Sequence, residues 1–130
     1  MERKEPYASQ EEFDKRVSHY PDIPLVELGP GSNSHLVCTK NITVSFITMD
    51  ANIRTSLHHH ESEQVMIVVD GECDEMVGGK LYHLGKGDII ILPSNIEHRA
   101  YISDRGCKAI DIFSPPRKDL VEKLEKISGV

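Results

Sequence analysis

The fold of this chain is decided by one stretch, Leu57-His58-His59-His60-Glu61-Ser62-Glu63-Gln64-Val65. Side chains on a strand alternate between two faces, so His58 and His60 point the same way and His59 points away. Gln64 opens an apolar run, and a short corner before it allows Gln64 to face the same interior as His58 and His60. The rival ligand, the Glu63 carboxylate, then lies on the opposite face.

A second segment, Pro93-Ser94-Asn95-Ile96-Glu97-His98, follows a later strand and turn. Imidazole suits zinc, copper, iron and nickel. The opposing interpretation, histidines on a surface strand with no ion, is weaker because buried imidazoles without a metal leave nitrogen lone pairs unsatisfied. The pattern therefore predicts one metal site with four ligands: His58, His60, Gln64 and His98.

The two segments resemble the two motifs of the cupin superfamily: His-x-His, then Glu or Gln, then Gly, and later Gly, Pro and a third His. The resemblance implies an all-β fold, the RmlC-like double-stranded β-helix or jelly-roll barrel, with short terminal helices. Because cupins host many chemistries, it does not by itself name a reaction. It covers roughly residues 42–117, with matches at His58, His60, Gln64, Gly71, Gly87, Asp88, Pro93 and His98.

Composition narrows the classes of partner. The hydrophobic share of 38% and the charged share of 28% are typical of a globular protein. The formal charge of −6 argues against nucleic acid, which needs a basic face. No secretory signal is visible, and the apolar runs are too short to span a bilayer. Three cysteines without a Cys-x-x-Cys pair indicate reduced thiols, so we expect a cytoplasmic protein.

The chain divides into three parts within one domain, residues 1–130. Residues 1–24 form a polar arm, in which Ser9-Gln10-Glu11-Glu12 fits a capping box and predicts a helix from about Glu11 to Ser18. Residues 25–113 hold short strands separated by turn residues, a pattern typical of a β-barrel. Residues 115–128 carry an apolar stripe at helical spacing.

Local patterns predict how the strands lie. Alternation over residues 42–48 predicts that Val44 and Phe46 face the core. Residues 53–60 are expected to form the strand that carries the first histidines. Glycines between two strand-like runs, at Gly78-Gly79, predict a tight hairpin.

Turn residues at Asp70-Gly71 and at Asp104-Arg105-Gly106 are expected to separate distinct strands. The apolar runs 65–69 and 89–92 predict strands covered on both faces. These runs carry more apolar surface than one thin barrel can cover. Together with the resemblance, they predict a homodimer.

Gln64 stands where many cupins have Glu, so all four expected ligands are neutral. A divalent ion held by them keeps its full positive charge and attracts an anionic or electron-rich oxygen of a small substrate. Octahedral coordination leaves two positions for water or substrate. Nickel, iron, manganese, cobalt and zinc all remain open as the metal.

A second constellation, Asp111-Ile112-Phe113-Ser114-Pro115-Pro116-Arg117, ends the barrel. Asp111 and Phe113 share one face of a strand; if that face is inward, a carboxylate near a cation becomes a candidate general acid or base. Arg117 is then placed to grip a substrate carboxylate with two hydrogen bonds. The alternative stays open: Asp111 is solvated at a strand end and Arg117 begins a surface helix.

The phrase Asp-x-Phe-x-Pro-x-Arg near the C-terminus is similar to the small dimeric cupins of pectin degradation called KdgF. That family converts unsaturated uronate monosaccharides to their open-chain form. The resemblance implies a catalytic set of Asp111, Phe113 and Arg117 facing the metal. Asp111 then moves the proton during hydration or tautomerisation of a cyclic enol ether.

Two other function classes stay open. A site of three histidines with open positions also fits an iron dioxygenase, which predicts oxygen uptake and an apolar pocket. A barrel that binds a ligand without turnover also fits, and it predicts no requirement for Asp111.

Overall fold

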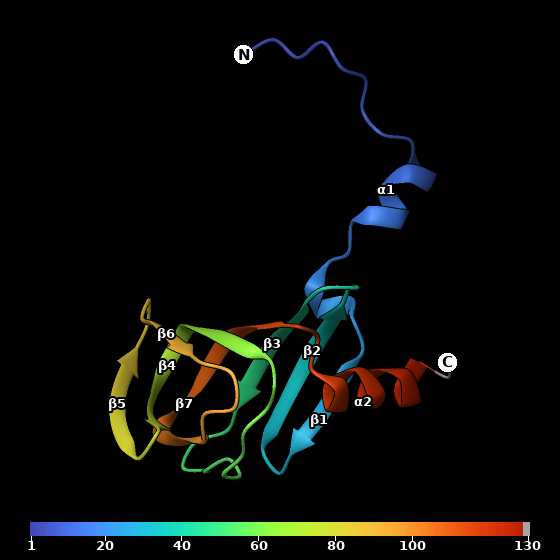
Figure 1. Cartoon of the computed structure of the whole chain (residues 1–130). Helices are drawn as coiled ribbons and strands as arrows, with labels where there is room; N and C mark the ends of the chain where they lie inside the picture. The colour runs from blue at the N-terminus through green and yellow to red at the C-terminus, as the bar shows by residue number, and fades with distance from the viewer. Residues whose placement is uncertain (129–130) are drawn as a thin grey trace.

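The computed structural model describes residues 1–128. Figure 1 shows a β-barrel with an N-terminal arm that extends away from it and a C-terminal helix packed beside its first strands. The elements are α1 (Gln10–Arg16), the 3-10 helix η1 (Tyr20–Asp22), β1 (Leu25–Gly29), β2 (Ser32–Cys38), β3 (Thr43–Met49), β4 (Glu63–Val77), β5 (Lys80–Gly85), β6 (Ile89–Leu92), β7 (His98–Ser114) and α2 (Lys118–Ser128).

All strand pairings are antiparallel, in the order β1-β2-β3-β7-β4-β5, and β6 pairs with β4. The first half of β4 pairs with β6 and its second half with β5, while β7 runs beside β4 along both halves. The two long strands therefore join two half-sheets into a jelly roll. The predicted all-β jelly-roll architecture with short terminal helices is confirmed.

Two predicted turns are bends inside these long strands. Gly71 and Gly106 both have positive φ, at 76° and 74°. A Cβ on Gly71 would collide with the carbonyl oxygen of Gly106 across the pairing. Residues 103–106 of β7 lie opposite the single residue Glu72. Glycine therefore marks a β-bulge that bends the strand, rather than its end. The hairpin at Gly78-Gly79 is confirmed.

The prediction that Val44 and Phe46 face the core is wrong. The buried residues of β3 are at the odd positions, beginning with Thr43 and Ser45, and Val44 and Phe46 are half-buried on the outer face. There Phe46 stacks on Tyr20 of η1, with ring centroids 4.8 Å apart. Alternation gives the period of a strand but not which face is inside, and here Ser45, Ile47 and Met49 on the inner face form part of the cavity wall.

Strand β6 is present, but one chain alone does not cover it on both faces. Ile89 and Ile91 are 61% and 63% exposed, whereas Leu92 is buried. Residues 53–60 do not form the expected strand either. They pair with β7 at two isolated bridges, Arg54 to Tyr101 and His58 to His98, and Thr55 accepts further hydrogen bonds from Arg99 and Ala100.

The terminal segments differ in how they attach. Ser9 and Glu12 form the predicted capping box, and α1 begins one residue before the expected start. No residue of α1 is buried. Helix α2 instead inserts Leu120 into a cluster with Val26 and Phe113. Neither helix in residues 1–128 has the length and apolar character needed to cross a membrane.

Candidate metal centre and cavity

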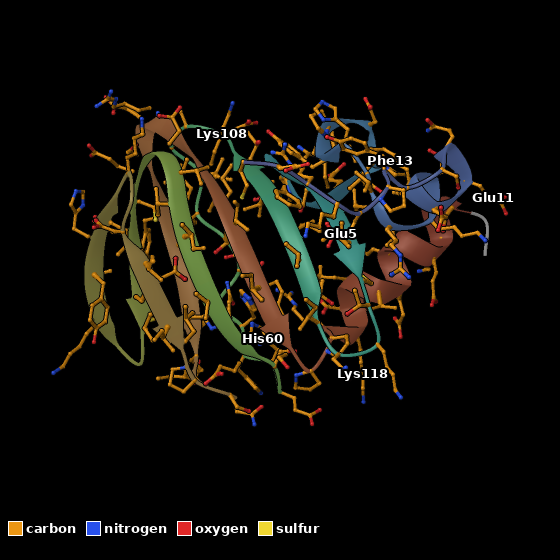
Figure 2. All side chains as sticks on the ribbon, turned by 90° about the horizontal axis from the view of Figure 1, so that it is seen from above. Glu5, Glu11, Phe13, His60, Lys108 and Lys118 are labelled. Atoms are coloured by element: carbon orange, nitrogen blue, oxygen red, sulfur yellow. The ribbon has the colours of Figure 1, made fainter. Side chains whose placement is uncertain are left out.

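Three imidazoles meet inside the barrel, as the spacing of the motif predicts. His58 and His60 come from the extended crossing segment, and His98 is the first residue of β7. One ligand atom from each lies within 4.8 Å of the others. Figure 2 looks down on the barrel, with His60 among the side chains between the strands and Phe13 far away on the arm. This cluster can hold a metal ion.

Backbone carbonyls fix the tautomer of each histidine. The Nδ1 atoms of His58, His60 and His98 lie 2.7, 2.8 and 2.9 Å from the carbonyl oxygens of Ser56, Ser62 and Ile96. A carbonyl only accepts, so each Nδ1 carries the proton and donates it. Each Nε2 is therefore left with a free lone pair, which is the arrangement of a metal-ligating histidine.

Burial supports the same assignment. It lowers the pKa of all three histidines, and that of His98 to about 4, so the rings are neutral at pH 7. The Nε2 atom of His98 is buried and has no hydrogen-bond partner within residues 1–128. An orphaned lone pair between two other neutral imidazoles fits a divalent transition metal.

The Gln64 amide lies beside this cluster. Its Nε2 donates to Asp111 Oδ1 at 2.9 Å, and its Oε1 lies 3.1 Å from His60 Nε2. The carboxylate therefore turns the amide so that its oxygen faces the histidines. Glu63 is exposed on the opposite face, as the alternation predicts. The role of Gln64 as a fourth ligand stays a prediction.

Asp111 is buried inside the barrel, 7% exposed, rather than solvated at a strand end. Cys107, Ala109 and Phe113 are buried on the same face of β7, as expected for an inward row. Burial raises the pKa of Asp111 to about 6, partly offset by the hydrogen bond from Gln64. Its Oδ1 accepts the hydrogen bond from the amide, and no hydrogen bond to Oδ2 is formed within residues 1–128.

Arg117 lines the same cavity, and its side chain is 17% exposed. Its Cζ lies 5.2 Å from the centroid of the Phe113 ring, which meets the His60 ring edge to face. The sequence did not reveal its partner, Asp119. Arg117 donates through Nε and Nη2 to the two Asp119 oxygens at 2.9 and 2.7 Å. The guanidinium is thus already aligned for a carboxylate.

These side chains surround one cavity of about 370 Å³. A second carboxyl group, Glu75, also lines it and was missed in the sequence. Glu75 is 3% exposed and its Oε2 has no hydrogen-bond partner within residues 1–128. Burial, followed by repulsion from Asp111, raises its pKa to about 8. The only signal in the sequence was the alternation Cys73, Glu75, Val77 on one face of β4.

Glu75 predicts a pH dependence of folding. Its pKa is about 8 in the folded protein and near 4.5 in the unfolded chain. Burying this group therefore costs least free energy of folding below pH 4.5, where it is protonated in both states. Stability should fall by about 4 kcal/mol as pH rises toward 8, because only the unfolded chain releases this proton readily. Glu75→Gln should remove most of that decline in urea unfolding of metal-free protein at pH 5 and 8. Glu27→Gln, at an exposed position, should keep it; an unchanged decline in Glu75→Gln would contradict the assignment.

Fold and site together define a small jelly-roll barrel whose inward histidines can hold a metal ion. The chain belongs to the cupin domain family, whose family model matches residues 45–113.

Similar proteins, two of them with solved structures, are consistent with membership of that family. The chain resembles an RmlC-like cupin from Shewanella frigidimarina, with a TM-score of 0.75 and 27% identity, covering 81% of this chain and 95% of that chain. It also resembles KdgF from Halomonas sp., with a TM-score of 0.71 and 25% identity, covering 77% and 93%. Uncharacterized protein SCO3923 of Streptomyces coelicolor is 25% identical over 77 residues, which are 59% of this chain and 73% of that protein.

Proposed function

We propose that this protein is a metal-dependent enzyme that opens or isomerises the ring of a small carboxylated sugar, an unsaturated uronate. One observation carries the proposal: a buried carboxyl, Asp111, lines the same cavity as three neutral histidines and Arg117. The similarity to KdgF-type cupins supports the same substrate class.

One divalent transition metal would be held by His58, His60, Gln64 and His98. When bound, it would supply a Lewis acid for a substrate oxygen or lower the pKa of a bound water. Because all four ligands are neutral, they leave the charge of the ion uncompensated, which favours an anionic substrate.

Side chains that line the cavity bind the substrate and transfer the proton. Arg117 binds the substrate carboxylate with two N–H groups, and the substrate displaces Asp119 from them. Phe113 supports the guanidinium from below and limits where the substrate ring can lie. Asp111 carries the proton on Oδ2 to or from the ring of the enol ether, while Gln64 holds Oδ1.

The test begins with elemental analysis of the purified protein, followed by a screen of unsaturated uronate monosaccharides. Metal-loaded protein should make the ring-enol absorbance fade, and chelated protein should not. If every unsaturated uronate keeps its absorbance in the presence of metal-loaded protein, the proposed reaction is wrong.

A dioxygenase is the second candidate because part of the cavity wall is apolar, with Ile47, Met49 and Met66 among its residues. It would consume oxygen in the metal-loaded sample, which an electrode measures in the same screen. A barrel that only binds its ligand would show neither oxygen uptake nor loss of the enol absorbance.

Arg117→Lys should raise KM about tenfold with little change in kcat, since a lysine cannot make two parallel hydrogen bonds to a carboxylate. The measurement is steady-state kinetics on the uronate that the screen identifies. Lys118→Ala, one residue further and exposed, is the control. Equal KM values for Arg117→Lys and wild type would remove Arg117 from the substrate contacts.

We also propose that two copies pack through the outer face of the larger half-sheet. Two rows of apolar side chains cross β6, β4, β7 and β3 in register, and Tyr20 at the base of the arm stacks on the end of one row. Uncovered faces of this kind mark protein contacts. The rows are Ile91, Val65, Ile112, Val44 and Ile89, Ile67, Ile110, Phe46.

A charge in these rows should separate the copies. Wild type should elute at twice the mass of one chain in size-exclusion chromatography with light scattering, and Ile91→Glu should elute as a monomer. Leu81→Glu, at an equally exposed site on β5, should stay dimeric. A monomeric wild type would contradict this interface.

A further inference from the structure

The buried side-chain atoms that lack a partner all face one place. Within residues 1–128 they are Ser32 Oγ, Glu75 Oε2 and His98 Nε2, and all three residues line the cavity described above. A bound metal would satisfy the lone pair of His98 Nε2. It would leave Ser32 Oγ and Glu75 Oε2, which come from β2 and from the second half of β4, without a partner.

Glu75 lines the cavity from the second half of β4. It pairs with Ala100 of β7, two residues along from the pairing of Val77 with His98. Arg117 follows the other end of β7, so Glu75 and Arg117 approach the cavity from opposite half-sheets. A ligand held by its carboxylate at Arg117 therefore extends toward Glu75.

No cation compensates the Glu75 carboxyl among the described residues. Arg117 is engaged by Asp119, and no ion pair to Glu75 is formed. Its charged neighbour in the cavity is Asp111, which repels an ionised Glu75. A buried acid next to another acid is retained at a loss of stability unless a bound group satisfies it, and in its neutral form it offers an O–H donor.

We propose that Glu75, assisted by Ser32, is a specificity-determining residue that donates a hydrogen bond to a ligand hydroxyl. The cavity then selects acids that carry hydroxyl groups on the side remote from the carboxylate. This inference rests on the proposed function for the placement of the carboxylate at Arg117. Ser32 Oγ, as donor or acceptor, supplies a second contact to the same hydroxylated side.

The experiment compares two stable ligands that do not react. D-galacturonate carries a carboxylate and hydroxyls, and cyclohexanecarboxylate carries only the carboxylate. Binding to metal-loaded full-length protein is measured by calorimetry. Wild type should bind galacturonate more tightly. Glu75→Leu should weaken the binding of galacturonate about tenfold or more, because a lost hydrogen bond to a buried polar group is worth that factor. The affinity for cyclohexanecarboxylate should not change.

Glu75→Gln is the conservative variant. Its amide N–H still donates, so its affinity for galacturonate should stay within a few-fold of that of wild type. Ser32→Ala should weaken the binding of galacturonate, but less than Glu75→Leu does. Equal galacturonate affinity in Glu75→Leu and wild type would overturn the proposal. Equal losses for both ligands would do the same, because they would indicate a collapsed cavity.

Turnover of unsaturated uronates, measured on the same samples, separates this inference from the proposed function. Discrimination between the two acids that depends on Glu75, without any turnover, supports the ligand class and rejects the reaction. Turnover by wild type without that discrimination supports the reaction and rejects the role of Glu75. A wild type that binds neither acid overturns the proposed ligand class.

Discussion

His98→Ala is expected to abolish stoichiometric metal binding. The Nε2 of His98 is a buried lone pair with no other partner within residues 1–128, and it lies between the two histidines of the other segment. Removing it leaves only the two imidazoles of His58 and His60, which come from one short stretch of chain, and opens a gap in the ligand set. Affinity should fall more than about 100-fold, since loss of a supporting hydrogen bond alone costs up to that factor.

Elemental analysis after dialysis gives the metal content, and thermal unfolding gives a second readout. Wild type should gain about 4 kcal/mol of stability when free metal exceeds its Kd about 1,000-fold, and His98→Ala should gain little. His83→Ala is the matched control, because that imidazole lies exposed on the β5 hairpin beside Asp74. Full metal content in His98→Ala would remove it from the ligand set.

The metal cluster could be predicted because it depends on local rules. Residues two apart on a stretch of chain between strands, His58 and His60, face the same cavity, and the second motif brings His98 beside them. Alternation does not show which face of a strand is buried in the core. Val44 and Phe46 have the right period but face outward, where Tyr20 covers Phe46. That contact joins residues distant in sequence, so no local pattern reveals it.

The missed residues of the site have the same explanation. Asp119 matters because α2 turns it back onto Arg117, and Glu75 matters because β4 bends at Gly71 instead of ending there. The apparent turn hid the continuity of β4, and with it the inward position of Glu75. The positions of Glu75 and Asp119 depend on strand bends and on contacts in the folded protein, which local sequence patterns do not show.

Asp111→Asn is expected to lower kcat about 10²- to 10⁴-fold on the uronate substrate while metal content stays unchanged. An asparagine is nearly isosteric, and its Oδ1 still accepts the hydrogen bond from Gln64 Nε2, so the amide keeps its oxygen toward the histidines. It cannot carry a proton between substrate atoms. The measurement is steady-state kinetics together with elemental analysis, and Asp104→Asn, at an exposed bend of β7, is the control.

Asp111→Ala distinguishes proton transfer from the orientation of the amide. It removes the acceptor of Gln64 Nε2, so the amide is free to turn, and metal affinity should then fall about tenfold in addition to the loss of turnover. If Asp111 served only to orient Gln64, the asparagine variant would keep full activity and only the alanine variant would lose it. Loss of turnover in both variants, with metal affinity reduced in alanine alone, requires that Asp111 both transfer the proton and hold the amide.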